Sequence, residues 1–130
     1  MNRDRHFSKE YFKVNSKRYR DILIKEDHKA WGNVWYMIHE DNHYHFALYM
    51  YHDDPSTIYL SNVFVNEKYR RNGYGNQILN YAEIFASHYK CEKIILNVLY
   101  NSFAYKWYLS KGYEFFEDNG KDYIWLVKYI

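Results

Sequence analysis

Short stretches rich in apolar residues are separated along the chain by polar turns, and this pattern predicts seven β-strands. Runs of Val, Ile, Tyr, Phe and Trp, either continuous or alternating with polar residues, are typical of buried or half-buried strands. The predicted strands are Tyr19–Lys25, Asn33–Glu40, Tyr44–His52, Thr57–Val65, Lys93–Tyr100, Tyr113–Phe116 and Tyr123–Tyr129. Residues 1–18 are polar, and we expect them to be irregular or to contain a short helix around Lys9–Val14.

Turn-forming residues connect several of these strands. The segment Asp41–His43 predicts a hairpin turn, and Asp53–Ser56, which contains the single proline, predicts another. In the last hairpin, Asn119 is followed by Gly120, and this pair is a strong signal for a tight turn.

Two segments have the spacing of helices. The apolar residues of the first recur at helical spacing, as Ile78, Ala82, Phe85 and Tyr89. The second helix follows Asn101, a residue type that caps helix N-termini well, and it ends before Gly112, which stands at the position just past a helix C-terminus. Antiparallel strands followed by a strand–helix–strand crossover predict a mixed α/β sheet.

Length and composition favour one domain that spans residues 1–130. The chain has 130 residues, one Pro and five Gly, with neither a repeat nor a low-complexity linker. Cys91 is the single cysteine, so no internal disulfide can form. No apolar run is long enough to span a bilayer, and the N-terminus lacks the apolar core of a signal peptide. We therefore expect a cytoplasmic protein with no membrane partner.

The charge pattern gives no support to nucleic-acid binding. The formal net charge is only +2, and acidic residues interrupt the mildly basic stretch from Arg3 to Arg20. Seventeen tyrosines provide amphipathic surface for packing or for lining a pocket. The abundance of Tyr, Asn, Lys and Ile hints at a bacterial or phage source.

Histidines around the first hairpin raise the question of a metal site. Metal ligands occur at set offsets and are supported by carboxylates or thiolates. The cluster lies at a predicted hairpin tip, where polar residues belong in any case, and we predict no metal there. Its members are His39, His43, His45 and His52, with Glu40, Asp41, Asp53 and Asp54 nearby.

The segment Val65–Gly75 carries the clearest functional chemistry. It joins a predicted strand to a predicted helix through a turn with two arginines and two glycines. A helix start presents unpaired N–H groups and partial positive charge, which attract anions. Gly73 and Gly75 would let a phosphate approach these amides, and Arg70 could add charge-assisted hydrogen bonds. The same residues could also form an ordinary strand–helix joint.

Two familiar phosphate loops do not fit this segment. A Walker loop requires Gly-Lys followed by Ser or Thr, and the chain has no such triplet. The dinucleotide-binding fingerprint requires a third glycine, but Gly75 is followed by Asn76, Gln77 and Ile78.

The pattern Arg-x-x-Gly-x-Gly after a strand that ends in Val65 resembles the acetyl-CoA loop of the GNAT superfamily of N-acetyltransferases. A second segment, Asn101–Phe115, resembles the family's other motif: Asn, Ala three positions on, Tyr four beyond, then Gly-Tyr entering a strand. The resemblance covers roughly residues 58–116. It implies the GNAT fold: a mixed, mostly antiparallel sheet with helices on both faces, here with a shortened N-terminal helical region.

The resemblance also implies roles for individual residues. The backbone of Val63, Phe64 and Val65 would bind the pantetheine arm of acetyl-CoA. Asn101 would contact the cofactor or cap its helix, and Tyr108 would protonate the departing thiolate. The pyrophosphate would lie on amides of the loop and helix start, formed by Arg70, Arg71, Asn72, Gly73, Tyr74, Gly75 and Asn76.

Two departures from the family pattern leave parts of the reaction open. Many members carry a carboxylate base on the strand that here is Thr57–Val65, but this strand has none. Asn62 or Ser61 could hold a water instead, or His45 or Glu40 could act as the base. The interval Ile24–Asn33 has room for a turn and not for the family's two helices, so the acceptor site would be open or would be closed by a partner subunit in a homodimer.

The sequence therefore predicts an N-acetyltransferase that moves acetyl from acetyl-CoA to a primary amine by direct attack in a ternary complex. An open site favours a protein lysine or N-terminus over a very small metabolite. The alternative is a non-catalytic acyl-CoA-binding module, which the missing carboxylate favours. A third class, a small nucleic-acid-binding protein, would show salt-sensitive binding to single strands.

Overall fold

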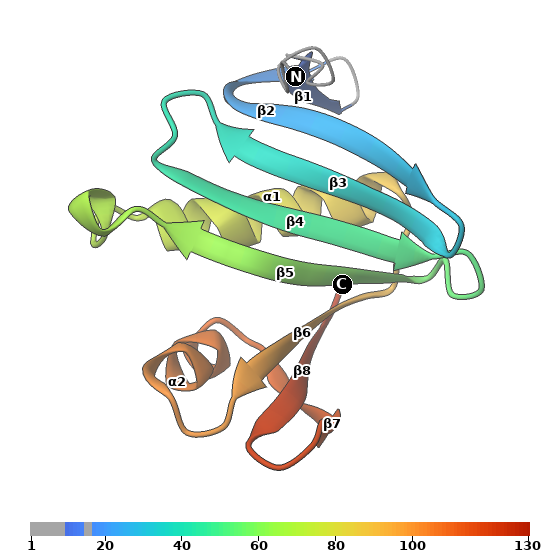
Figure 1. Cartoon of the computed structure of the whole chain (residues 1–130), viewed down its shortest axis with the longest axis vertical. Helices are drawn as coiled ribbons and strands as arrows, with labels where there is room; N and C mark the ends of the chain where they lie inside the picture. The colour runs from blue at the N-terminus through green and yellow to red at the C-terminus, as the bar shows by residue number, and fades with distance from the viewer. Residues whose placement is uncertain (1–9, 15–16) are drawn as a thin grey trace.

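Eight strands form one mixed sheet in the order β1-β2-β3-β4-β5-β6-β8-β7 (Figure 1). The structure is a computed structural model that describes residues 10–14 and 17–130. Neighbouring strands are antiparallel except β5 and β6, which are parallel and joined through α1. The strands are β1 (Glu10–Val14), β2 (Lys17–Lys29), β3 (Gly32–His39), β4 (Tyr44–Tyr51), β5 (Thr57–Val65), β6 (Lys93–Leu99), β7 (Glu114–Asp118) and β8 (Tyr123–Tyr129), and the helices are α1 (Tyr74–His88), α2 (Phe103–Ser110) and a 3₁₀ helix at Glu67–Tyr69. This is the mixed, mostly antiparallel fold class that the sequence predicts.

The N-terminal segment differs from the prediction of irregular chain or a short helix around Lys9–Val14. Lys9 lies outside the described residues, and Glu10–Val14 form β1, which pairs antiparallel with β2. Side-chain burial alternates along this strand: Tyr11 and Lys13 are exposed and Phe12 is buried. The ring of Phe12 stacks on Phe85 of α1 at a centroid distance of 6.0 Å. Burial of the Phe12 ring against α1 is a tertiary contact that favours a strand here.

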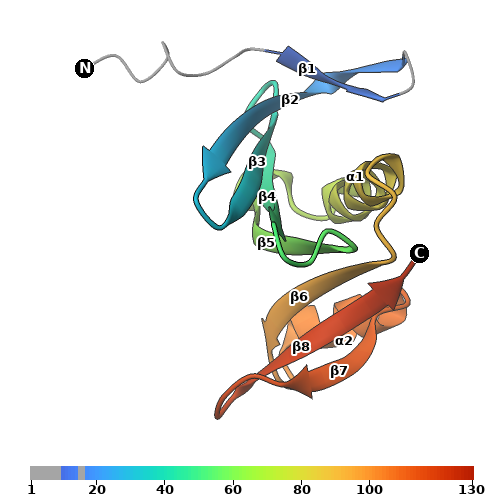
Figure 2. The same ribbon diagram turned by 90° about the vertical axis from the view of Figure 1, so that its right-hand side faces the viewer.

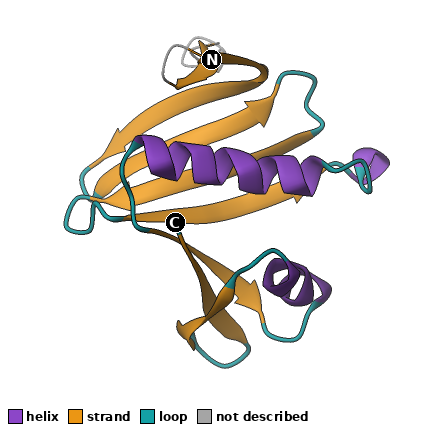
Figure 3. Ribbon diagram, turned by 180° about the vertical axis from the view of Figure 1, so that it is seen from behind, coloured by secondary structure: helices purple, strands orange, loops and turns teal. Residues whose placement is uncertain are grey.

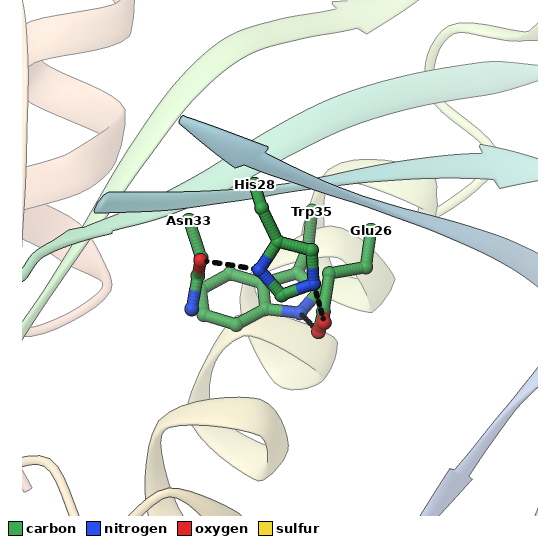
Figure 4. A network of polar contacts seen from close by, with 4 residues as sticks. All are labelled: Glu26, His28, Asn33 and Trp35. Atoms are coloured by element: carbon green, nitrogen blue, oxygen red, sulfur yellow. Dashed lines mark hydrogen bonds and ion pairs between the residues drawn. The ribbon is translucent and has the colours of Figure 1, made fainter. Parts of the chain in front are cut away.

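The hairpin of β2 and β3 is longer than predicted, and only residues 30–31 separate its strands. The expectation that this interval has no room for two helices is confirmed. A polar network ties the hairpin together (Figure 4). Glu26 accepts a hydrogen bond from the indole nitrogen of Trp35 at 2.5 Å and contacts His28 at 3.0 Å, and the His28 ring meets the side-chain oxygen of Asn33 at 2.9 Å.

One hydrophobic core lies between the sheet and the helices. Helix α1 crosses the back of the sheet (Figure 3) and buries Ile78, Ala82 and Phe85 against it, as their spacing predicts. Tyr89, the fourth residue of the predicted spacing, is instead the C-cap residue just past the helix and is exposed. Tyr108 of α2 belongs to the same core cluster. In the described part of the chain both helices thus pack on one face, and this detail differs from the expected helices on both faces. The reason is the two-residue β2–β3 connection, which supplies no helix for the opposite face.

A β-bulge interrupts strand β5 and opens the sheet. His45 pairs with Phe64 and Ala47 pairs with Ser61, so Asn62 and Val63 together face one residue of β4. Asn62 has φ 52°, in the left-handed region. The parallel pairing of β5 with β6 ends at Leu60. Beyond this point the two strands diverge, as Figures 1 and 2 show.

The predicted turns and helix end agree with the structure. Residues 40–43 connect β3 and β4, and Asn119 with Gly120 lies in the turn between β7 and β8. At the end of α2, the Gly112 N–H donates to Leu109 and the Tyr113 N–H donates to Tyr108, the bonds of a Schellman motif. Neither α-helix of the described residues combines the length and apolar character needed to cross a membrane.

Candidate active site

A cleft of about 640 Å³ lies where β5 and β6 separate, between the start of α1 and helix α2. It brings together nearly all of the residues predicted to bind the cofactor, and Tyr108 as well. Asn72 and Asn101 are the two predicted residues that do not line it. The lining residues are Val63, Phe64, Val65, Tyr69, Arg70, Arg71, Gly73, Tyr74, Gly75, Asn76, Phe103, Ala104, Trp107 and Tyr108.

The loop from β5 to α1 follows a defined path. Asn66 accepts a hydrogen bond from the Lys68 N–H at 3.3 Å and so caps the 3₁₀ helix. The side-chain Nε of Arg70 donates to the carbonyl of Val65 at 3.1 Å, which holds the guanidinium beside the end of β5. Arg71 has φ 70°, a left-handed conformation that is uncommon for a residue with a side chain. Such strained positions cluster at ligand-binding sites.

The start of α1 is suited to an anion. Its N-cap residue is Gly73, which provides no side-chain hydrogen bond to the helix. The N–H groups of Tyr74, Gly75 and Asn76 have no partner within the helix, because the first turn lacks preceding carbonyls. Helix dipole and free N–H groups together attract phosphate. Arg70 and Arg71 add positive charge at the same side of the cleft.

Gly73 and Gly75 are required to be glycine for two different physical reasons. Gly73 has φ 79°, and a Cβ placed on it would meet no atom within 4 Å, so its backbone conformation demands the glycine. A Cβ on Gly75 would lie only 2.9 Å from the ring of Trp107. The sequence suggested that both glycines clear space for a phosphate. In the structure, Gly75 also lets α2 approach the start of α1.

Tyr108 lies on α2 and its side chain lines the cleft. The residue is only 8% exposed, and burial raises the pKa of its phenol. Its ring meets Tyr113 edge-on at 5.7 Å. The Schellman motif at the end of α2 and this aromatic contact fix its position. A buried phenol at the wall of a cleft can donate a hydrogen bond to a developing anion.

Asn101 does not cap α2, and that predicted alternative is wrong. The N-cap is Ser102, whose Oγ accepts a hydrogen bond from the Tyr105 N–H at 3.1 Å. Asn101 precedes it with φ 60°, a conformation that Asn tolerates better than most residues. Its side chain is exposed. The predicted contact of Asn101 with a cofactor stays a prediction.

A second hollow, of about 520 Å³, lies on the sheet face opposite α1. We call it the acceptor groove. It shares Val63 and Phe64 with the first cleft, so the two hollows meet at the β5 bulge. Its lining residues are Tyr36, Met37, Ile38, His45, Phe46, Ala47, Asn62, Val63 and Phe64.

Two of the four residues considered for the removal of the amine proton line the acceptor groove. His45 and Asn62 line it, and the His45 ring stacks on Phe64 at 5.1 Å. Glu40 lies outside the groove and accepts a hydrogen bond from Tyr11 at 2.9 Å. Ser61 pairs with Ala47 next to the groove without lining it. His45 and Asn62 are therefore the two of these residues that face the junction of the hollows.

His39 and His43 lie on the side of the sheet that carries α1, whereas His45 lines the acceptor groove on the opposite face. His39, Asp41 and His43 have potential ligand atoms within 4.8 Å of one another. The rings of His39 and His43 stack at 4.5 Å with planes 16° apart, and lone pairs in near-parallel planes do not converge on one ion. His43 Nδ1 is 2.7 Å from the Tyr74 hydroxyl, so this cluster supports the start of α1. Burial, and then the neighbouring His43, lower the pKa of His39.

Several lining residues were not predicted from the sequence. Tyr69 lies within the predicted loop but carries no phosphate-binding signal. Phe103, Ala104 and Trp107 line the cleft because α2 packs across the start of α1, which is a tertiary contact without a local sequence pattern.

Comparison with known proteins agrees with this geometry. The sequence model of the Acetyltransferase (GNAT) family matches residues 4–113. The comparison with curated proteins gave no match. Solved structures with the same fold include an IAA acetyltransferase from Bacillus cereus ATCC 14579, with a TM-score of 0.63, 16% identity, and coverage of 84% of this chain and 99% of that one.

Two further similar structures hold a cofactor. A GNAT family acetyltransferase from Elizabethkingia anophelis with acetyl-CoA bound has a TM-score of 0.61, 17% identity, and coverage of 86% of this chain and 100% of that one. PaiA N-acetyltransferase from Thermoplasma acidophilum in complex with coenzyme A has a TM-score of 0.62 and 17% identity, and the match covers 85% of this chain and 62% of that one. At these identities the similarity is one of fold. With the family match over residues 4–113, the chain belongs to the GNAT acetyltransferase family.

Proposed function

We propose that this protein transfers the acetyl group of acetyl-CoA to a primary amine by direct attack within a ternary complex. The observation that carries this proposal is the junction of two hollows at Val63 and Phe64. One hollow has an anion-attracting helix start and a buried phenol, and the other opens on the opposite face of the sheet. Two substrates could thus meet from opposite sides.

The cofactor would occupy the first cleft. Its diphosphate would accept hydrogen bonds from the N–H groups at the start of α1 and from Arg70. The pantetheine arm would bind along Val63–Val65, because the pairing of β5 with β6 ends before these residues; the Val65 carbonyl already accepts a hydrogen bond from Arg70, so the remaining backbone groups of this segment would serve the arm. The thioester would then lie near the bulge, between the phosphate-binding loop and Tyr108.

The amine would enter through the acceptor groove. An alkylammonium with a pKa of ~10.4 must first lose a proton, which costs about 4–5 kcal/mol at neutral pH. His45 supplies an imidazole to the groove lining, and Asn62 could hold a water that relays the proton. The neutral nitrogen would attack the carbonyl carbon, the C–N bond would form, and the C–S bond would break.

Tyr108 would return a proton to the departing thiolate. Between a phenol of pKa ~10 and a thiol of pKa ~8.5 this transfer is uphill by about 2 kcal/mol. Burial raises the pKa of Tyr108, which weakens it as an acid. The same low-dielectric cleft would also destabilise the thiolate, and thereby offset part of that penalty.

A non-catalytic acyl-CoA-binding module is the second candidate. It is favoured by the lining of the two hollows, which includes no carboxylate. Such a module would bind acetyl-CoA in the same cleft and would leave its thioester intact.

Calorimetric titration with acetyl-CoA, coenzyme A and NADH tests the cofactor assignment, and a thiol-release screen with amines tests turnover. We expect binding of both coenzyme A species, no binding of NADH, and amine-dependent thiol release. Failure to bind acetyl-CoA would refute both candidate functions. Binding without turnover on any amine would favour the binding module.

A further inference from the structure

We propose that the acceptor is a small aromatic primary amine, an arylalkylamine with a neutral body, which binds in the acceptor groove. This inference rests on the proposed acetyltransferase function and adds the chemical class of the second substrate. In the balanced reaction the amine nitrogen displaces the coenzyme A thiolate from the acetyl carbon. The amine loses one proton, and coenzyme A leaves as the thiol.

The floor of the groove is lowest at Ala47. Ala47 of β4 pairs with Ser61 of β5, and on the other side Ala47 pairs with Tyr36 of β3. Residues directly opposite on neighbouring strands share a face, so these three side chains lie on the face away from α1. Strands β3, β4 and β5 are seen nearly edge-on in Figure 2, with α1 on one side of them and no helix on the other. The short side chain of Ala47 leaves room for a ligand in the groove, and Ser61 lies next to it.

One aromatic pair lines the groove, and a second lies beyond it on the same face of the sheet. His45 stacks on Phe64 at 5.1 Å with planes 26° apart, at the end where the groove meets the cofactor cleft. Two residues further along both strands from the floor, Tyr49 stacks on Tyr59 at 4.9 Å with planes 6° apart. The two pairs are about 13 Å apart along β4. The aromatic lining at Tyr36, His45 and Phe64 suits one aromatic ring with a short amine-bearing chain.

The charges of the groove disfavour a polycation. No Asp or Glu is among its lining residues. On the same face of β2, Lys25 pairs with Tyr36, and the next residue on that face, Asp27, is already bound to Lys29 at 3.0 Å. A polyamine or a lysine-rich peptide would therefore find no carboxylate in the groove lining, and would lose hydration there without compensation. A single amine that is deprotonated before attack does not pay this cost.

The first test compares acceptors with the wild-type protein at saturating acetyl-CoA. The panel is 2-phenylethylamine, spermidine and a lysine-containing peptide with a blocked N-terminus, and the readouts are thiol release and product mass. We expect kcat/KM for 2-phenylethylamine to exceed the other two values by about tenfold or more. Equal or better use of spermidine or the peptide would overturn the inference and leave the proposed function standing.

Substitutions in the groove give an independent test. Ala47→Leu fills the floor and should lower kcat/KM for 2-phenylethylamine about tenfold with acetyl-CoA affinity unchanged. Ala30→Leu is the matched control, because Ala30 is exposed in the β2–β3 turn and outside the groove. Because Ala47 is buried and a leucine there could disturb folding, Ile38→Glu is the second variant. It places a carboxylate in the groove and should shift the preference toward spermidine about threefold.

A binding measurement tests the acceptor class separately from the proposed acetyltransferase function. The coenzyme A-loaded protein is titrated calorimetrically with 2-phenylethylamine. Saturable binding that Ala47→Leu weakens and Ala30→Leu preserves supports the inference even if turnover is slow. Tight coenzyme A binding without any binding of 2-phenylethylamine overturns it. If acetyl-CoA itself does not bind, the proposed function fails, and the acceptor class fails with it.

Discussion

Replacement of Gly75 by alanine should weaken cofactor binding through Trp107. The new Cβ would lie 2.9 Å from the Trp107 ring, whereas carbon atoms in ordinary contact are about 3.5–4.0 Å apart. The ring must therefore move by roughly 0.6–1 Å. Trp107 is half-buried and also lines the cofactor cleft, so this movement changes the shape of the cleft.

Two opposing terms decide the effect on stability. Alanine is favoured over glycine in a helix interior by up to about 1 kcal/mol, and Gly75 lies in the first turn of α1, where less of this is gained. Overpacking typically costs about 1–3 kcal/mol. We expect a net loss of about 1 kcal/mol of unfolding free energy. The affinity for acetyl-CoA should fall about tenfold, equivalent to about 1.4 kcal/mol.

The assay is calorimetric titration with acetyl-CoA, combined with urea denaturation. The double variant Gly75→Ala with Trp107→Phe tests the cause, because phenylalanine lacks the ring atoms Cζ2 and Cη2 nearest to the added Cβ. We expect it to recover part of the affinity lost in Gly75→Ala. Gly120→Ala is the control: its φ of 82° makes alanine costly, but it lies in the distant β7–β8 turn. Wild-type affinity in Gly75→Ala, or strict additivity in the double variant, would refute the reasoning.

Four further predictions test other parts of the molecule. Tyr108→Phe should lower kcat by up to about 10²–10⁴-fold with little change in acetyl-CoA affinity, and wild-type turnover would remove the phenol from the reaction. Arg70→Gln should weaken acetyl-CoA binding about tenfold or more in calorimetry, since a charge-assisted bond to phosphate is lost; unchanged binding would contradict the assignment. Burial lowers the pKa of His39, so as the pH falls the unfolded state takes up this proton before the folded state does. The free energy of unfolding should therefore decrease as the pH drops below about 6.5. The urea midpoints measured at pH 7.5 and pH 5 should differ less in His39→Asn than in the wild type. Phe115 of β7 is 57% accessible and could form the interface of the expected homodimer. In that case the wild type should sediment as a dimer and Phe115→Glu as a monomer; a monomeric wild type would exclude this interface.

The parts of the site that the sequence predicts are those encoded within a few residues. The strand ending at Val65, the turn with Gly73 and the apolar spacing of α1 are local signals, and a helix start follows from them directly. The sequence predicts Asn101 as a possible cap of α2, one position before the cap in the structure, Ser102. Either residue type caps a helix well, so composition alone does not place the boundary.

Other features depend on contacts between distant parts of the chain. The β1 strand follows from the burial of Phe12 against Phe85, and a five-residue segment is too short a pattern to reveal it. The approach of Trp107 to Gly75 joins two helices that sequence motifs treat separately. The acceptor groove combines side chains from three strands whose register a sequence does not specify.

The bulge at Asn62 reverses which side of the sheet each later residue of β5 faces. Before it, Ile58 and Leu60 point into the core; after it, Phe64 shares a face with His45, while Val65 packs against the core. Loss of Asn62 or Val63 would restore regular one-to-one pairing and leave Phe64 and Val65 on their present faces, whereas loss of a residue between Ile58 and Ser61 would turn apolar core residues toward solvent. A deletion in this strand should therefore be tolerated at the bulge and poorly tolerated before it, and related chains should differ in length at this point of β5 if they differ in length at all.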